Sequence, residues 1–135
     1  MKLKTVPVEW VHRTWPLVEP MITEALKHSK GEATPTNALQ YLSQGQWILI
    51  VVVDDDEQIH GAITMEVFNR PDARVAFITS IGGKLISNQD TFAQLKAIAA
   101  SMGATALEGA ARESVARLWS RFGFEEKYRI VGVKL

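Results

Sequence analysis

The chain has 135 residues, of which 47% are apolar and 22% charged, a composition typical of one globular domain and not of a disordered segment. Fifteen basic residues balance fifteen acidic ones, so no net field attracts the protein to nucleic acid or to an anionic membrane. The absence of cysteine excludes disulfides, thiolate metal sites and cysteine nucleophiles. We expect a single domain over residues 1–135, located in the cytoplasm, with neither a nucleic-acid nor a membrane partner.

The first third of the chain predicts one strand followed by helices. Residues Leu3–Val8 suit an edge strand. The apolar spacing over residues 9–27 suits one or two amphipathic helical pieces, with a break near Pro16, because an interior proline removes a backbone donor. Thr36 then caps a short helix that ends at Gly45.

The middle of the chain predicts three antiparallel strands. Residues Trp47–Val53 are apolar on both faces, as in a central strand that is covered on each side. An acidic turn at 54–58 leads into the alternating segment 59–67, which we predict to be its hairpin partner. A second turn at 69–72 leads to a third strand over Arg74–Ile81.

The last third predicts helix, strand, helix and a final strand. A helix opens at residues 87–90 and ends at Gly103, a strand follows over Ala104–Glu108, and a second helix leads to Phe124 and a last extended segment. Hairpin strands followed by helical crossovers imply an α/β (α+β) fold, with a mixed sheet of about six or seven strands and helices on both faces.

This order resembles the GNAT acyltransferase fold over nearly the whole chain. Residues 46–53, the acidic turn and residues 59–63 are similar to the second and third strands of that family. Val115–Trp119 with Gly123–Phe124 resembles the family pattern Ala-x-x-Leu-Tyr followed by Gly-Phe. The pair Gly82–Gly83 and the short helices before Trp47 also resemble divergent GNAT-like proteins of bacteriophages and prophages.

The resemblance implies an N-acyltransferase that moves an acetyl or other acyl group from acetyl-CoA to an amine on a small molecule or a protein. The family binds the pyrophosphate of coenzyme A with a Gly-x-Gly or Gly-x-Ala loop before the long helix. In this chain that position falls near Ile86, Ser87 and Asn88, which include no glycine. Ser87 and Asp90 instead fit a capping box, and Asp90 puts a negative charge in the first turn.

Two glycines lie just upstream of that position. The segment Ile81, Gly82, Gly83 and Lys84 allows close backbone approach and suits either an anion-binding nest with Lys84 as its point charge, or a tight turn with a solvated lysine. We take Ile81, Gly82, Gly83, Lys84, Ser87 and Asn88 as the candidate cofactor-binding residues. The cofactor site further requires two parallel strands that diverge near this segment and leave a slot for the pantetheine arm.

Acyl transfer also needs a base, donors for an oxyanion and a proton for the leaving thiolate. Trp119 occupies the position of the tyrosine that acts as the general acid in the family. Because an indole does not ionise near neutral pH, we expect Trp119 to pack in the core instead. Glu66 and Glu108 are the candidate catalytic bases, provided that burial raises their pKa values; a solvated carboxylate is the alternative for each. Backbone groups at the end of the Arg74–Ile81 strand are the candidate oxyanion donors. The three histidines lack metal-ligand spacing, so we expect no metal site.

Two functions therefore stay open on the sequence. The first is an acetyl-CoA-dependent N-acetyltransferase. The second is a catalytically inactive GNAT-like binding or assembly module, for instance of a phage, because the glycine loop and the tyrosine are both missing. A homodimer through an edge strand or the last strand fits either function.

Overall fold

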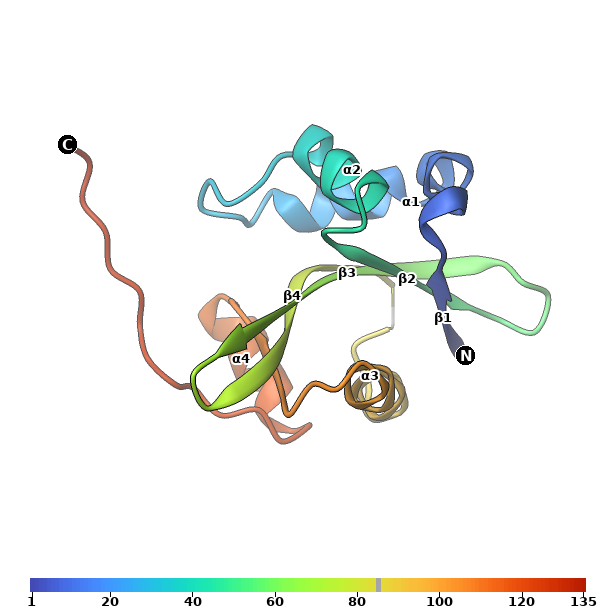
Figure 1. Ribbon diagram of the computed structural model, residues 1–135. Helices are drawn as coiled ribbons and strands as arrows, with labels where there is room; N and C mark the ends of the chain where they lie inside the picture. The colour runs from blue at the N-terminus through green and yellow to red at the C-terminus, as the bar shows by residue number, and fades with distance from the viewer. Residues whose placement is uncertain (85) are drawn as a thin grey trace.

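The computed structural model describes residues 1–84 and 86–135. Figure 1 shows its elements, which in chain order are β1 (Lys2–Val6), the 3₁₀ helix η1 (Val8–Trp10), α1 (Val11–Leu26), α2 (Pro35–Ser43), β2 (Ile48–Val53), β3 (Ile59–Arg70), β4 (Ala73–Gly83), α3 (Gln89–Ser101), β5 (Ala106–Gly109) and α4 (Glu113–Ser120).

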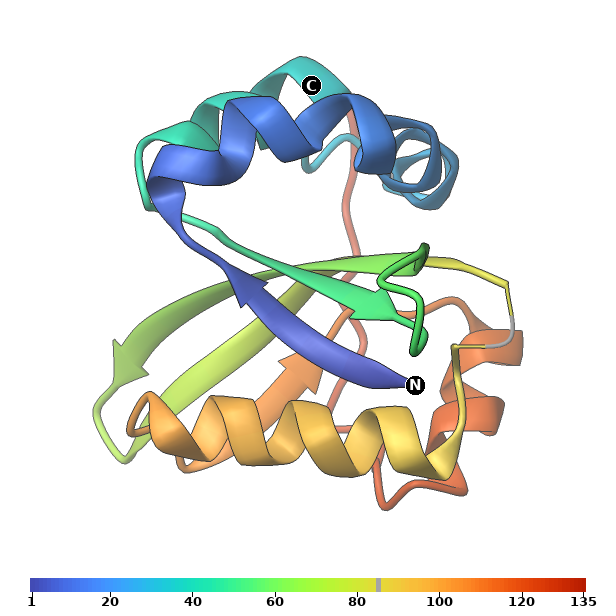
Figure 2. The ribbon, with the colours of Figure 1, turned by 90° about the vertical axis from the view of Figure 1, so that its right-hand side faces the viewer.

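The strands form one sheet in the order β1-β2-β3-β4-β5. The first three pairs are antiparallel, and β4 pairs with β5 in parallel, a connection that needs the crossover through α3. Figures 1 and 2 show α1 and α2 on one face of the sheet and α3 and α4 on the other. The predicted mixed sheet with helices on both faces is confirmed, but the described residues form five strands instead of six or seven.

The second strand explains why the molecule has a core on each face of the sheet. Leu49, Val51 and Val53 pack with the buried residues of α1 and α2, whereas Ile50 and Val52 pack with those of α3 and α4. All five side chains are buried. The prediction of a central strand covered on both sides is thus confirmed, since a strand with apolar residues on both faces needs two covering layers.

The predicted break near Pro16 is wrong, because α1 continues through both Pro16 and Pro20. These two prolines are exposed, so the carbonyls that lose a backbone donor lie on the solvent side of the helix. The opposite face carries the buried residues Val11, Val18, Ile22 and Leu26. Burial of that stripe holds the helix together despite the two lost hydrogen bonds.

The second helix is capped by Thr34 and not by the predicted Thr36. The Thr34 side chain accepts a hydrogen bond from the backbone N–H of Asn37, and the Asn37 side chain accepts one from the backbone N–H of Thr34, both at 3.1 Å. Pro35 occupies the first helical position, where its missing N–H costs nothing.

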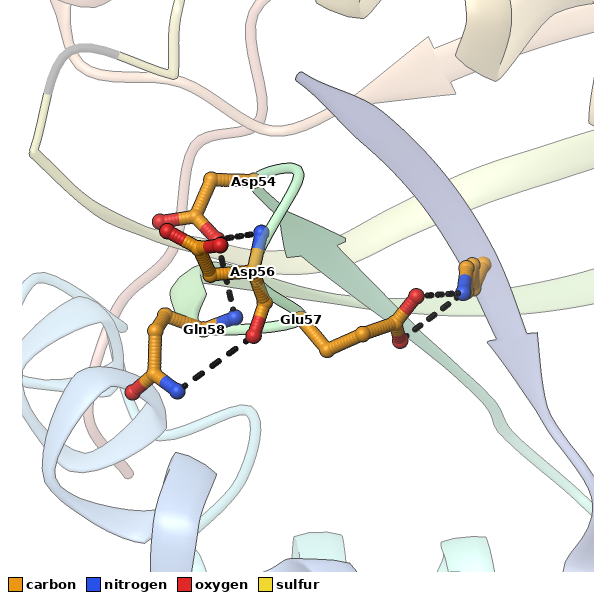
Figure 3. A network of polar contacts seen from close by, with 5 residues as sticks. Asp54, Asp56, Glu57 and Gln58 are labelled. Atoms are coloured by element: carbon orange, nitrogen blue, oxygen red, sulfur yellow. Dashed lines mark hydrogen bonds and ion pairs between the residues drawn. The ribbon is translucent and has the colours of Figure 1, made fainter.

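The predicted acidic turn between β2 and β3 is confirmed and is shown in Figure 3. Asp54 Oδ1 accepts hydrogen bonds from the backbone N–H groups of Asp56 (2.8 Å) and Gln58 (3.0 Å). Glu57 has a φ of 62°, and its carboxylate binds Lys4 Nζ at 2.7 Å. The turn is therefore closed by its own side chains and tied to β1.

The predicted last strand is absent from the structure. Residues 125–135 form neither helix nor strand and extend away from the body (Figure 1).

The glycine pair at the end of β4 is needed for close packing. Gly82 lies opposite Ala62 of β3, and a Cβ on Gly82 would stand 2.4 Å from the carbonyl oxygen of Met21 in α1. Gly83 has a φ of +127°, and a Cβ there would stand 2.3 Å from the carbonyl oxygen of His60. Both contacts are with backbone atoms, so a side chain at either position would have to move α1 or β3.

We expect Gly82→Ala to lower the free energy of unfolding by about 1–3 kcal/mol, the usual cost of overpacking. Urea unfolding followed by circular dichroism measures it. Gly132→Ala is the matched control, because nothing lies within 4 Å of a Cβ there. An equal, small effect of the two substitutions would contradict the packing role of Gly82.

Candidate functional site

The parallel strands β4 and β5 stay paired along the whole of β5, which is the shorter of the two. They pair from Val75–Ala106 to Ile78–Gly109, where β5 ends, while β4 continues to Gly83. Within the described residues, the later part of β4 is paired with β3 alone. The predicted divergence of two paired strands is therefore not seen: β5 ends before the Ile81–Lys84 segment, and the slot for a pantetheine arm stays a prediction.

A β-bulge in β4 lies directly after its last pair with β5, Ile78–Gly109. Thr64 of β3 pairs with Ser80, and the next residue, Met65, pairs with Ile78, so Thr79 has no residue opposite it. Such a bulge takes backbone groups out of the regular ladder and bends the strand. The expected location of oxyanion donors, near the end of this strand, therefore coincides with an irregular backbone segment.

Three hydroxyl groups fix the bulge. Thr64 Oγ1 lies 2.7 Å from Thr79 Oγ1 and 2.6 Å from Ser80 Oγ, and Thr64 is fully buried. Alternation along β3 puts Glu66 on the same face as Thr64, opposite Phe77 of β4. Glu66 is half-buried, and none of the described hydrogen bonds or ion pairs involves its carboxylate.

The second candidate base, Glu108, is held by two cations. Its Oε2 lies 2.5 Å from Arg70 Nη1 and 3.0 Å from Lys127 Nζ, and the side chain is 11% exposed. The hydrogen bond from Arg70, more than any other contact, lowers the pKa of Glu108, and the bond from Lys127 adds to that effect against the opposing effect of burial. The prediction that burial raises the pKa of Glu108 is therefore wrong. The Glu108 carboxylate instead links β5 to β3 through Arg70 and to the C-terminal segment through Lys127.

The cap of the long helix α3 is Asn88 and not Ser87, so the predicted capping box of Ser87 and Asp90 is wrong. Asn88 Oδ1 accepts a hydrogen bond from the backbone N–H of Thr91 at 2.9 Å, while Ser87 lies half-buried before the cap. Asp90 lies in the first turn, as predicted, and its carboxylate accepts a hydrogen bond from Gln94 Nε2 at 3.1 Å. The helix end thus already has an internal acceptor and a nearby negative charge.

The predicted glycine loop is part of β4. Ile81, Gly82 and Gly83 pair with Ile63, Ala62 and Gly61 of β3, so their backbone forms a strand end instead of a turn or nest. Lys84 follows and is exposed. Cofactor binding by Ile81, Gly82, Gly83, Lys84, Ser87 or Asn88 stays a prediction.

Trp119 packs in the core, as expected, at the end of β5. Its ring centroid lies 5.5 Å from that of Phe92 and 5.2 Å from that of Phe124. A Cβ on Gly109 would stand 2.8 Å from the Trp119 ring, so the glycine makes room for the indole. Trp119 Nε1 is the one buried side-chain polar atom in the described part of the chain that has no hydrogen-bond partner. Such an unpaired donor is unfavourable in a dry core.

Two surface hollows lie elsewhere. One is apolar and lies between the end of β1, α2 and β2; the other is lined by Trp15, Glu19, Pro35, Thr36 and Leu39. Neither includes a residue proposed for catalysis or cofactor binding. Over residues 1–84 and 86–135, no three His, Asp or Glu side chains gather as metal ligands, and no helix is long and apolar enough to cross a membrane.

Two features of the site were not found from the sequence. The bulge at Thr79 depends on strand register, although the polar pair Thr79–Ser80 in an otherwise apolar strand was a signal for it. The two cations at Glu108 come from residues 38 and 19 positions away, a pairing that no local pattern reveals.

Comparison with known proteins identifies the fold. No family model matches the chain, and no curated protein matches it by sequence. A probable acetyltransferase shares its structure with a TM-score of 0.71 at 13% identity, covering 100% of this chain and 97% of the other. A ribosomal-protein-alanine N-acetyltransferase from Brucella melitensis matches with a TM-score of 0.72 at 10% identity, with both chains fully covered. An aminoglycoside 6′-N-acetyltransferase from Acinetobacter baumannii matches with a TM-score of 0.65 at 14% identity, covering 99% of this chain and 97% of the other. The chain thus has the fold of GNAT acetyltransferases.

We expect Glu108→Gln to lower the free energy of unfolding at pH 7 by about 1–3 kcal/mol, because hydrogen bonds to charged groups are lost. The folded pKa of Glu108 lies below its unfolded value, so this contribution is present above about pH 4.5 and is lost as the pH falls through the folded pKa. Urea unfolding at pH 7 and pH 3 should therefore show a smaller difference between variant and parent at pH 3.

Glu113→Gln is the control, since that carboxylate is 88% exposed and lies 3.6 Å from Arg117. A difference between parent and Glu108→Gln that stays constant with pH would contradict the ion-pair role.

Proposed function

We propose that this protein is an N-acetyltransferase that transfers an acetyl group from acetyl-CoA to a primary amine. The observation that carries the proposal is the coincidence, at one level of the sheet, of the Thr79 bulge in β4 and the end of β5 at Gly109. The bulge supports a role in oxyanion stabilisation, and the unpaired side of β4 beyond the end of β5 supports binding of an extended thioester there. The acetyltransferase structures that share the fold support the same reaction class.

The unpaired indole N–H of Trp119 supports cofactor binding. It is a buried donor beside Gly109, at the end of the strand where the slot would begin. A carbonyl or sulfur acceptor of a bound thioester would satisfy it. Lys84, Ser87 and Asn88, which lie between β4 and α3, would contact the phosphates, with Lys84 as the cation and the dipole of α3 as a further attraction. Acetyl-CoA supplies the activated acyl group when bound.

Glu66 is the base in this proposal. Its carboxylate is not held by a cation, in contrast to that of Glu108, and it lies on the same face of β3 as the hydroxyl group of Thr64. Glu66 would accept the ammonium proton of the acceptor, directly or through one water molecule. Trp119 donates hydrogen bonds without giving up its proton, so the thiolate takes its proton from solvent.

The acceptor in this proposal is an amine of a small molecule or of a protein. Phe68 and Phe77 lie on the face of Glu66, are half-buried, and have ring centroids 6.3 Å apart. They offer an apolar surface next to the base, which suits an amine carried on an apolar or aromatic group.

The cap at the start of α3 favours the second candidate, a catalytically inactive GNAT-like module such as a phage-encoded assembly protein. The Asn88 side chain already accepts the hydrogen bond of the Thr91 backbone N–H, which a phosphate oxygen would otherwise accept. The negative charge of Asp90 in the first turn also repels a phosphate. This candidate predicts no acetyl transfer.

We expect acetyl-CoA to raise the free energy of unfolding by about 2.7 kcal/mol at one hundred times its Kd, because it binds the folded chain alone. Lys84→Ala should weaken binding by about 1 kcal/mol without changing the stability of the free protein, because Lys84 is exposed. Isothermal titration and thermal shift measure both effects. Lys30→Ala, another exposed lysine, is the control. If the Lys84→Ala and Lys30→Ala variants bound acetyl-CoA with equal affinity, Lys84 would be excluded as a phosphate-binding residue.

We expect Glu66→Gln to lower kcat/KM by ~10²–10⁴-fold, the usual contribution of a general base, while leaving the Kd of acetyl-CoA unchanged. Release of the coenzyme A thiol over a panel of amines measures the rate. Glu125→Gln, in the exposed C-terminal segment, should keep full activity. Turnover that survives Glu66→Gln would exclude Glu66 as the base, and binding without any turnover would favour the inactive module.

A further inference from the structure

The C-terminal segment is the largest feature that the proposed function leaves unexplained. After Phe124 the chain leaves the body and extends into solvent (Figure 1). Its exposed apolar residues, with their exposed fractions, are Tyr128 (65%), Ile130 (83%), Val131 (90%), Val133 (85%) and Leu135 (117%). Single exposed apolar residues are common, but five of them within eight residues are typical of a surface that a partner covers.

The pattern of this segment is that of a β-strand. Val131, Val133 and Leu135 alternate and would share one face, and the segment is rich in β-branched residues, which favour strands. No strand of the described chain pairs with it. Its backbone N–H and C=O groups are therefore available to an open sheet edge.

The sheet has two edges, β1 and β5, and the β1 edge is partly covered. At the β1 edge, the Gln94 side chain accepts from the backbone N–H of Leu3 (3.0 Å) and donates to the carbonyl of Met1 (2.9 Å). Lys2 and Lys4 add charge there, which is a usual protection of edge strands. At the other edge, the outer side of β5 carries no strand among the described residues.

The start of the segment is held beside that open edge. Lys127 Nζ binds Glu108 Oε2 of β5 at 3.0 Å, and the chain beyond Lys127 runs away from the body (Figure 1). The segment thus starts beside the open edge of β5 but does not pair with β5 of its own chain. Two copies that face each other at β5 would each have a segment directed toward the partner.

We propose that residues Tyr128–Leu135 of one copy pair as an added β-strand with the outer edge of β5 of a second copy, and that the exchange is reciprocal. The contact is then the same on both chains, so a twofold homodimer closes on itself and does not continue into a filament. The exchange removes the open edge and covers the apolar residues of both segments at once.

Sedimentation equilibrium of the full chain tests this proposal. We expect a species of twice the 15.0 kDa chain mass that dissociates on dilution. The double variant Val131→Lys/Val133→Lys and a chain ending at Lys127 should both be monomers. Because residues 128–135 are exposed in the single chain, both variants should stay folded, and their circular dichroism spectra should lack only the β signal of the added strand. Lys134→Ala is the matched control and should stay dimeric.

Cross-linking identifies the contact, since the chain has no cysteine of its own. Leu107→Cys in one chain and Val131→Cys in a second, ¹⁵N-labelled chain should give a mixed cross-linked dimer with a short bis-maleimide, read by mass spectrometry. A chain that carries both substitutions and cross-links only within itself would overturn the proposal, because the segment would then cover its own β5. A parent that stays monomeric at 0.5 mM, or a dimer that survives removal of residues 128–135, would overturn it as well.

Discussion

The structure depends on β4, which must pair on its two sides with strands of opposite direction. Its antiparallel partner β3 extends along the whole strand, whereas its parallel partner β5 follows only from Val75 to Ile78. The bulge at Thr79 lets the strand bend at that point, and the Thr64, Thr79 and Ser80 hydroxyl groups satisfy one another where the ladder is irregular. One irregular residue thereby separates the part of β4 that pairs with strands on both sides from the part that pairs with β3 alone.

Glu66 and Glu108 show how the same side chain acquires different chemistry in one sheet. Both lie opposite Phe77, one on each neighbouring strand. Glu108 meets Arg70 and Lys127, so its negative charge is stabilised and its pKa falls. Glu66 meets no cation among the described residues. Sequence position alone did not separate the two, because the cations come from distant parts of the chain.

Patterns that depend on neighbouring residues were predicted from the sequence. The apolar run of β2, the acidic turn after it and the buried Trp119 each follow from local spacing and residue type. Features that depend on tertiary contacts were not. Pro16 fails to break α1 because the buried stripe on the opposite side outweighs one missing hydrogen bond. Gly82 lies in a strand because it pairs with Ala62 of β3, and it must be glycine there because Met21 approaches it closely. The strand count was too high because the last segment, although strand-like in composition, has no neighbour within its own chain.

The bond between Lys127 and Glu108 links the position of the C-terminal segment to the proton affinity of a residue inside the sheet. When the segment departs and takes Lys127 with it, Glu108 keeps only Arg70 and binds a proton more readily. Reciprocity then requires that protonation of Glu108 loosen the segment by the same free energy. Acidity and the conformation of the C-terminus are thus two readouts of a single equilibrium in this molecule.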